Sequence, residues 1–180
     1  GAVSGDINVG GLTGAMAIEF DFDPEDDIAR EGSTSAKFQF LTRSVLRDSV
    51  NYGNVTARKN CVGGAVGWMD LGLVDRCENY GSVTSTAGGY TGGIAGQSEA
   101  VIQNCWVKCN ISGLRYLGGI AGSGTDISGC RVFASIDESA PYTGSIAGEA
   151  VGTLSLNYFV SDTLGGVDGI SYAGKAQAMT

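Results

Sequence analysis

The side chains best suited to chemistry in this sequence are carboxylates and thiols, because 19 Asp and Glu and 5 Cys occur without any His. The absence of histidine excludes Ser-His-Asp and Cys-His catalysis and removes the commonest zinc ligand. The formal net charge of −8 disfavours nucleic acid and anionic membrane surfaces as partners. No run reaches the roughly 18 apolar residues of a membrane-spanning helix, so we expect no membrane insertion in this segment.

The densest group of carboxylates lies near the N-terminus. Calcium prefers such oxygen ligands and takes about six to eight of them. The group lacks the D-x-[DN]-x-[DN]-G spacing of an EF-hand loop. We therefore interpret it as a solvated strand face and turn, with calcium binding as the alternative. Its members are Glu19, Asp21, Asp23, Glu25, Asp26 and Asp27.

The other carboxylates of the repeated region are scattered along the chain. Glycoside hydrolysis would need two of them facing each other across a groove, and parallel β-helices with such activity provide only a fold-level analogy. The sequence indicates no such pair, so we expect no catalytic residues, no cofactor and no metal site. The scattered acids are Asp70, Asp75, Glu78, Glu99, Asp126, Asp137, Glu138 and Glu149.

A glycine-rich hexapeptide recurs through the chain and is its strongest pattern. The last four copies begin 29, 26 and 26 residues apart, whereas the first gap is 53 residues. The long gap indicates one normal unit that carries an insertion. The copies are Val9–Gly14, Val62–Gly67, Thr91–Gly96, Leu117–Gly122 and Thr143–Gly148.

Three of the five cysteines recur in one slot at the same period. We interpret them as small buried hydrophobes, with redox activity or a disulfide between neighbouring repeats as the alternatives. Cys105 and Cys109 are four residues apart but lack the further ligands of a zinc site. The slot holds Ser49, Cys77, Cys105, Cys130 and, in a degenerate last copy, Tyr158.

The residue before each hexapeptide forms another regular column. Its tyrosines, with Trp68 and Trp106 elsewhere, would suit a stacking platform for sugars. We favour a structural ladder in which each ring packs on the next. The column consists of Cys61, Tyr90, Tyr116 and Tyr142.

The repeat units have 25 to 29 residues and are rich in Val, Ile, Gly and Asn without a helical period, which predicts short strands joined by turns. Stacked coils about 4.8 Å apart bury a face that one unit cannot bury alone. Ile94, Ile120 and Ile146 are then expected to form an inward column, continued upstream by Leu12. We predict an all-β fold, a right-handed parallel β-helix (β-solenoid) of about five coils, with residues 1–180 as a single domain.

Two segments depart from the repeat. Residues 15–45 are predicted to form an inserted acidic lobe, a hairpin that projects from the solenoid. Residues 161–180 are predicted to form a turn-rich polar cap, with residues 173–179 either frayed or leading into a further domain. Because residues 1–5 match the end of a repeat unit, we expect further coils of a parent protein before Gly1.

The Gly-Gly-Ile-Ala-Gly, Ile-x-Asn-Cys and Gly/Asn-x-Val elements resemble the GLUG motif of bacterial surface proteins over residues 46–160 and the first 14 residues. The insertion and Ser145 depart from that pattern. The resemblance implies a secreted or cell-surface location and carries no catalytic residue to this chain. We therefore predict a non-enzymatic structural or adhesion module of a larger bacterial protein. Its partners would be host or matrix proteins, glycans, or other domains of the parent chain; the alternative is a carbohydrate-binding or carbohydrate-processing β-helix.

Overall fold

The computed structural model describes residues 1–17, 44–171 and 174–179, and within these ranges it contains 24 β-strands and no helix. Accordingly, no helix in the described ranges is long and apolar enough to cross a membrane. The predicted hairpin lies mostly outside the described residues. The same is true of all six carboxylates of the acidic run: Glu19, Asp21, Asp23, Glu25, Asp26 and Asp27.

The strands stack into four parallel sheets. Sheet A contains β1 (Val3–Gly5), β6 (Val55–Ala57), β11 (Val83–Ser85), β15 (Asn110–Ser112) and β19 (Ser135–Ile136). Sheet B contains β2 (Val9–Gly10), β7 (Val62–Gly63), β12 (Thr91–Gly92), β16 (Leu117–Gly118) and β20 (Thr143–Gly144). Sheet C contains β3 (Thr13–Met16), β4 (Val45–Arg47), β8 (Val66–Met69), β9 (Leu73–Asp75), β13 (Ala95–Gln103), β17 (Ala121–Ser128), β21 (Ala147–Ala150) and β22 (Leu154–Ser155). Sheet D contains β5 (Val50–Asn51), β10 (Glu78–Asn79), β14 (Trp106–Val107), β18 (Arg131–Val132), β23 (Asn157–Phe159) and β24 (Ala176–Ala178).

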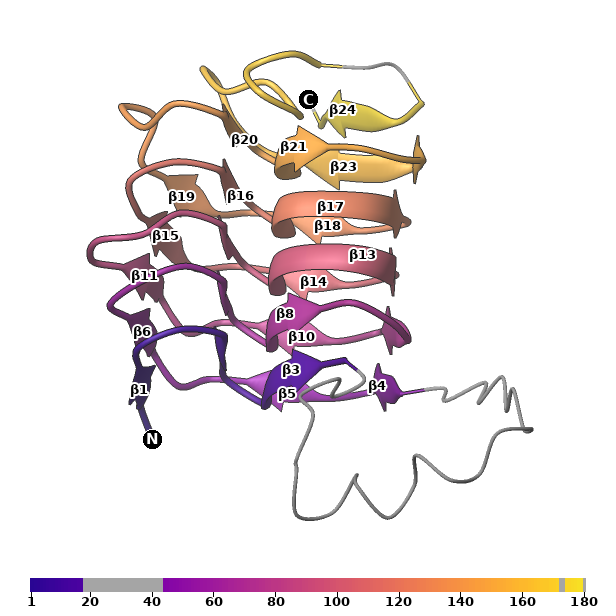
Figure 1. The fold of residues 1–180 in the computed structure, drawn as a ribbon. Coiled ribbons are helices and arrows are strands. Elements are labelled where there is room, and N and C mark those ends of the chain that lie inside the picture. The colour runs from indigo at the N-terminus through magenta and orange to yellow at the C-terminus, as the bar shows by residue number, and fades with distance from the viewer. Residues whose placement is uncertain (18–43, 172–173, 180) are drawn as a thin grey trace, which may run out of the picture.

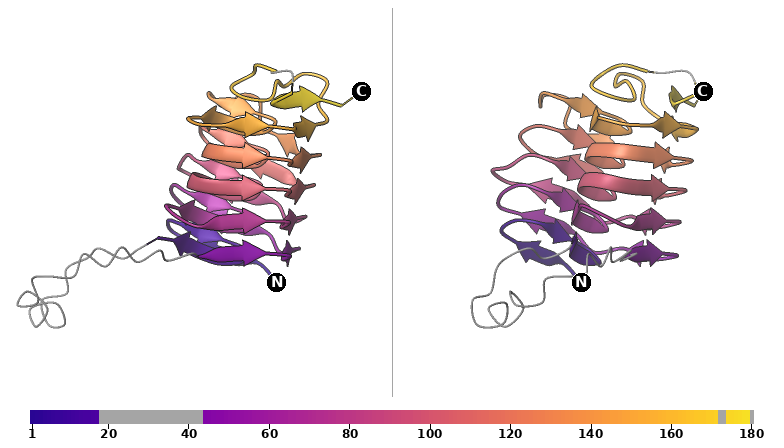
Figure 2. Two further views of the ribbon diagram at one scale, coloured as in Figure 1. Left: turned by 90° about the vertical axis from the view of Figure 1, so that its right-hand side faces the viewer. Right: turned by 45° about the vertical axis from the view of Figure 1, so that its right-hand side comes forward.

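The chain visits sheets A, B, C and D in turn and then rises to the next rung, so the predicted parallel β-solenoid is confirmed. Sheets A and B have five strands each, and four full turns therefore separate the first rung from the fifth. In Figure 1 the chain crosses the near side from left to right along β13 and β17 and returns behind along β14 and β18 while climbing, which is a right-handed winding. Figure 2 shows the rungs stacked along one axis with the termini at opposite ends.

The expected inward column of isoleucines is present. Ile94, Ile120 and Ile146 are completely buried, and the backbone N–H of each of the first two donates to the carbonyl of the next. Leu12 occupies the equivalent position in the first coil, where its N–H donates to Ala65, but its side chain is 40% exposed. The register prediction for Leu12 is thus correct, and its exposure follows because no rung of the described structure covers it.

Two corners of every coil use the left-handed backbone conformation. One corner is the residue before each hexapeptide, and the other lies between sheets C and D. L-residues adopt this conformation at a cost of about 1–2 kcal/mol, so its repetition shows that the coil geometry imposes it. The positive φ angles of the first corner occur at Asn8 (53°), Cys61 (62°), Tyr90 (59°), Tyr116 (53°) and Tyr142 (57°). Those of the second occur at Asp48 (50°), Arg76 (50°), Asn104 (54°), Gly129 (65°) and Leu156 (54°).

The third residue of the hexapeptide is glycine wherever another full coil lies above it. A Cβ on Gly93 would lie 2.1 Å from the carbonyl oxygen of Gly119, and one on Gly119 would lie 2.0 Å from that of Ser145. The serine in the last copy therefore marks the end of the regular stack. Its hydroxyl donates to the carbonyl of Leu164 at 3.2 Å, which ties the C-terminal tail to the final coil.

The C-terminal tail continues the backbone pairing after the sequence period has failed. The amide of Ser145 donates to Gly165 and that of Ile146 to Gly166, both at 2.8 Å. Strand β24 then pairs in parallel with β23. Val167 and Ala176 are buried against the core. Residues 161–179 thus include a shortened sixth rung, which the sequence pattern did not predict.

The solenoid extends into both ends of the segment 15–45 that was predicted to be an insertion. β3 runs to Met16, which is buried and in register with Met69, and β4 begins at Val45 in register with Leu73. Ala15, Met16 and Val45 therefore belong to strands of the solenoid, and residues 18–43 lie outside the described structure. In the next coil only residues 70–72 separate the corresponding strands.

Candidate functional site

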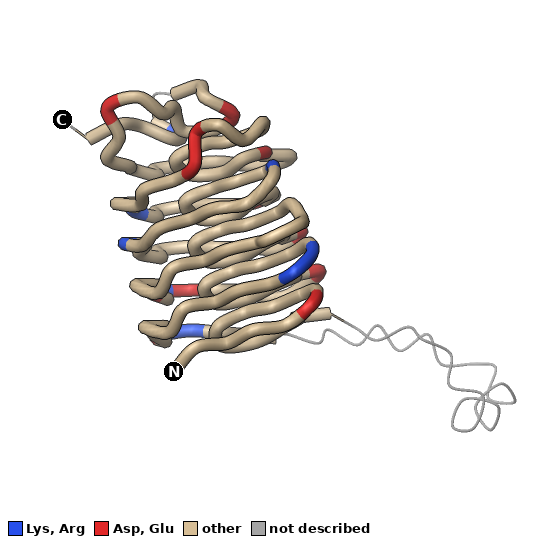
Figure 3. The backbone as a smooth tube through the Cα atoms, turned by 90° about the vertical axis from the view of Figure 1, so that its left-hand side faces the viewer, with Lys and Arg blue, Asp and Glu red and all other residues tan. Residues whose placement is uncertain are grey.

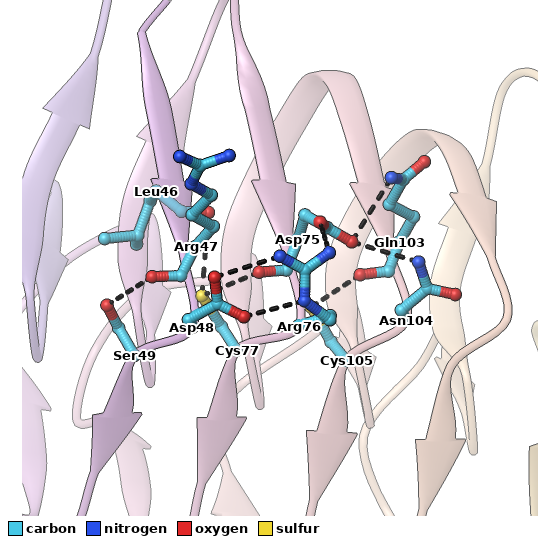
Figure 4. Close-up of polar contacts among 10 residues, drawn as sticks. All are labelled: Leu46, Arg47, Asp48, Ser49, Asp75, Arg76, Cys77, Gln103, Asn104 and Cys105. Carbon is cyan, nitrogen blue, oxygen red and sulfur yellow. Dashed lines mark hydrogen bonds and ion pairs between the residues drawn. The ribbon is translucent and has the colours of Figure 1, made fainter.

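An ion-pair network joins the first two coils at the corner between sheets C and D (Figure 4). The Arg76 guanidinium donates from Nε to Asp48 Oδ1 at 2.7 Å and from Nη2 to Asp48 Oδ2 at 2.9 Å. Its third nitrogen, Nη1, contacts Asp75. The left-handed backbone at Asp48 and Arg76 turns these two side chains toward each other on adjacent rungs. A single guanidinium therefore bridges two carboxylates.

Asp75 extends this network to the third coil. Its side chain is only 8% exposed and accepts hydrogen bonds from Gln103 Nε2 at 3.2 Å and Asn104 Nδ2 at 3.0 Å, besides the Arg76 contact. A buried carboxylate needs such partners, because burying it unpaired would cost several kcal/mol. The network thus connects three coils through side chains as well as through the backbone.

Two carboxylates that pair with arginine or lysine, Asp48 and Asp6, have lowered pKa values. The hydrogen bonds from Arg76 hold the pKa of Asp48 below its ordinary value. At the N-terminal end, Lys59 and Arg58 likewise lower the pKa of Asp6. A general acid for glycoside hydrolysis needs the opposite change, a raised pKa. The environment of Asp48 is therefore suited to an ion pair that holds two coils together, and it is the opposite of one that keeps a carboxylic acid protonated.

A groove of about 330 Å³ lies beside the network. Trp106 stands between Glu78 on the rung below and Arg131 on the rung above, all three in register in sheet D. The indole stacks on Phe133 with ring centroids 4.6 Å apart and an interplanar angle of 30°. Arg131 is exposed and forms no ion pair with any described residue. The groove is lined by Arg76, Glu78, Asn104, Cys105, Trp106, Gly129 and Arg131.

The cysteine column has the burial that the sequence predicted. Cys77, Cys105 and Cys130 are buried and are free thiols. Burial raises the pKa of Cys77 to about 11, and a hydrogen bond with Cys130 together with burial raises the pKa of Cys105. Thiols in such surroundings are poor nucleophiles, because the reactive form is the thiolate.

The assignment of Tyr158 to the cysteine column is wrong by one residue. Tyr158 pairs with Arg131, so Asn157 is the residue of the next coil that is equivalent to Cys130. The spacing explains this result, since Asn157 is three residues after Leu154 just as Cys130 is three after Ile127. Asn157 is completely buried and accepts a hydrogen bond from the Cys130 amide at 3.0 Å.

The tyrosine column forms the predicted ladder. The Tyr90 and Tyr116 ring centroids are 4.7 Å apart at 8°, and those of Tyr116 and Tyr142 are 4.6 Å apart at 7°. Because each inner face is covered by the next ring, only the ring edges and the outer faces of the two end rings are left for contact with a sugar. Trp68 lies in sheet C and Trp106 in sheet D, so neither extends the ladder into a platform.

Charged residues elsewhere are dispersed. Figure 3 shows acidic and basic positions scattered along the length of the solenoid. Besides Asp75, five of the scattered acids accept hydrogen bonds from nearby residues. Glu78 accepts from the Tyr80 hydroxyl at 2.6 Å, and Glu149 from the Ser123 hydroxyl at 3.1 Å. The other three acceptors are Asp126, Asp137 and Glu138. In the described ranges no three His, Cys, Asp or Glu side chains converge as a metal site would require.

The fold and this geometry define the protein as a β-solenoid with a polar groove on one corner. Comparisons with protein-family models, with curated proteins and with solved structures gave no match. The resemblance to the GLUG motif therefore stays a prediction that depends on the repeat residues alone.

Proposed function

We propose that this chain is a non-enzymatic structural or adhesion module of a larger secreted or cell-surface bacterial protein. The observation that carries the proposal is the unbroken stacking of equivalent residues. Val55, Val83 and Ile111, for example, lie in register on successive rungs and are 0–2% exposed. A stack of this kind keeps the distance between its ends constant, which is what a stalk or a presenting surface requires.

Side-chain interactions between coils support the same role. The Asp48–Arg76–Asp75 network, the tyrosine ladder and the hydrogen bond from Asn51 Nδ2 to Asn79 Oδ1 at 2.8 Å all run along the axis. None of them is arranged around a reacting centre. They resist bending and sliding of one rung against the next, because each would have to break before the rungs separate.

The proposed role is tested by combining a shape measurement with a binding assay on the 180-residue chain. Small-angle scattering should give the dimensions of a rod that do not change between low and high salt. A panel of host glycans and matrix proteins should then reveal binding without turnover. A scattering profile that is typical of a flexible chain and changes with salt would contradict the structural role, which we call the scaffold role. Cleavage of a polysaccharide would contradict the non-enzymatic assignment. A secretion signal and a wall anchor in the parent gene would support the location.

The alternative is a carbohydrate-binding or carbohydrate-processing β-helix. The observation that favours binding is the groove beside Trp106, which combines an aromatic ring with charged and amide groups. Processing has weaker support, because the carboxylate pair at Asp48 and Asp75 is shared by one guanidinium. Polysaccharide cleavage that is lost in Asp48→Asn or Asp75→Asn would establish the processing alternative.

A further inference from the structure

We propose that the groove beside Trp106 binds an acidic saccharide, with a pyranose ring stacked on the indole and its carboxylate paired with Arg131. The proposal rests on the adhesion role proposed above and gives it a ligand class and a site. It concerns the groove described for sheet D, whose wall is formed by three adjacent rungs, β10, β14 and β18.

Trp106 provides the apolar platform. One side of its indole packs on Phe133, so the ring is held in place before any ligand arrives, and the residue also lines the groove. A pyranose presents a face of C–H groups, which pack well on an aromatic ring. Preorganisation of the ring reduces the entropy that binding must overcome. Trp106 sits on a strand paired on both sides, which restricts its movement further.

Arg131 accounts for the acidic character of the ligand. Both arginines in the groove carry a fork of donors that matches a carboxylate. The guanidinium of Arg76 already donates to Asp48 and Asp75, whereas Arg131 is exposed and has no acidic partner in the described structure. The guanidinium of Arg131 is therefore the one in this groove that a ligand carboxylate would meet.

The remaining groups suit the hydroxyls of a sugar. Asn104 gives an N–H to Asp75, which leaves its carbonyl oxygen as an acceptor, and Glu78 has a second carboxylate oxygen besides the one bonded to Tyr80. Gly129 leaves room for the Asn104 side chain in the groove lining, because a Cβ at position 129 would lie 2.6 Å from Asn104 Oδ1. The volume of about 330 Å³ lies at the lower end of the range of roughly 300–1,000 Å³ for ligand pockets, which suits a short saccharide.

The test compares trigalacturonic acid with its neutral counterpart, galactotriose, on the intact 180-residue chain by calorimetry and tryptophan fluorescence. The chain has two tryptophans, so Trp68→Phe is a matched control for Trp106→Phe. We expect tighter binding of the acidic sugar, a fluorescence change that survives Trp68→Phe, and loss of that change in Trp106→Phe.

Arg131→Gln should weaken binding of the acidic sugar by about tenfold or more and leave the neutral one unchanged, as expected for losing a charged hydrogen bond. Melting curves of each variant confirm that it is folded. Equal affinity for both sugars, affinity that does not depend on Trp106 and Arg131, or no binding of the acidic sugar would overturn the proposal. These outcomes leave the scaffold role standing, because that role is judged by scattering.

Discussion

Gly119 and Ser145 occupy the same position in consecutive coils, and the carbonyl oxygen of Ser145 fills the space that a side chain on Gly119 would need. A Cβ on Gly119 would lie 2.0 Å from that oxygen. Above Ser145 the next rung is the shortened one of the C-terminal tail, and the serine hydroxyl bonds to Leu164. The hexapeptide glycine is therefore a consequence of stacking, and the serine shows where regular stacking ends.

Substitution of these two residues should have unequal effects. Gly119→Ala forces backbone against backbone and should lower the free energy of unfolding by at least about 1–3 kcal/mol. Ser145→Ala loses only one hydrogen bond and should cost about 1 kcal/mol. Urea denaturation of both variants measures how much free energy of unfolding each one loses. Equal losses would show that the close contact between the two coils is not present.

The left-handed corner between sheets C and D gives a stabilising substitution. Leu156 has φ 54° and is 59% exposed, while Gly129 serves the same corner one coil earlier with φ 65°. Leu156→Gly should raise the free energy of unfolding by about 0.5–1 kcal/mol, since relief of the left-handed strain exceeds the added flexibility of the unfolded chain.

The converse change, Gly129→Ala, should destabilise by at least about 1–2 kcal/mol, because the alanine adopts the same strained backbone and its Cβ also meets Asn104 Oδ1 at 2.6 Å. Thermal melting of the pair of variants provides the comparison. If Leu156→Gly lowered the melting temperature, the corner would not be under the strain inferred for it.

Acid should weaken the contact between the first two coils. Arg76 lowers the pKa of Asp48 in the folded protein below its ordinary value of about 3.8. The carboxylate therefore stabilises the fold at pH above its unfolded pKa, and this contribution is lost as the pH falls through the lowered folded pKa. Asp48→Asn should melt at a lower temperature than the natural sequence at pH 7, and the two should converge near about pH 2. If the difference in melting temperature between the two proteins stayed constant across this pH range, the ion pair with Arg76 would not be the source of the stabilisation by Asp48.

Thiol chemistry tests the interpretation of the cysteines. Burial raises the pKa of Cys61 and Cys77 to about 11 and of Cys109 to about 12. Native protein should react slowly with a thiol-specific disulfide reagent at pH 8, and all five cysteines should react after unfolding in denaturant. Rapid reaction of a native thiol would favour the redox alternative, and fewer than five thiols after unfolding would indicate a disulfide.

The repeat residues were enough to predict the columns, because like residues at one period must stack once the coils are in register. Ile94, Ile120 and Ile146 and the three tyrosines follow directly from that rule. The Asp48–Arg76–Asp75 network was not predictable, since its residues differ in type from coil to coil and therefore leave no pattern. The backbone pairing of Gly165 with Ser145 and of Ala176 with Asn157 was hidden for a related reason: the last rung is shortened, which breaks the sequence period but keeps the backbone register.

The central claim is that equivalent side chains in successive coils stabilise each other directly. A double-mutant cycle on Ile94→Val and Ile120→Val measures this coupling through urea denaturation, with Leu114→Ala, on a side chain that is 58% exposed, as the matched control. We predict a coupling free energy of at least about 0.5 kcal/mol between the two isoleucines and none between Ile94 and Leu114. Additive effects of Ile94→Val and Ile120→Val would contradict the stacked column and the role built on it.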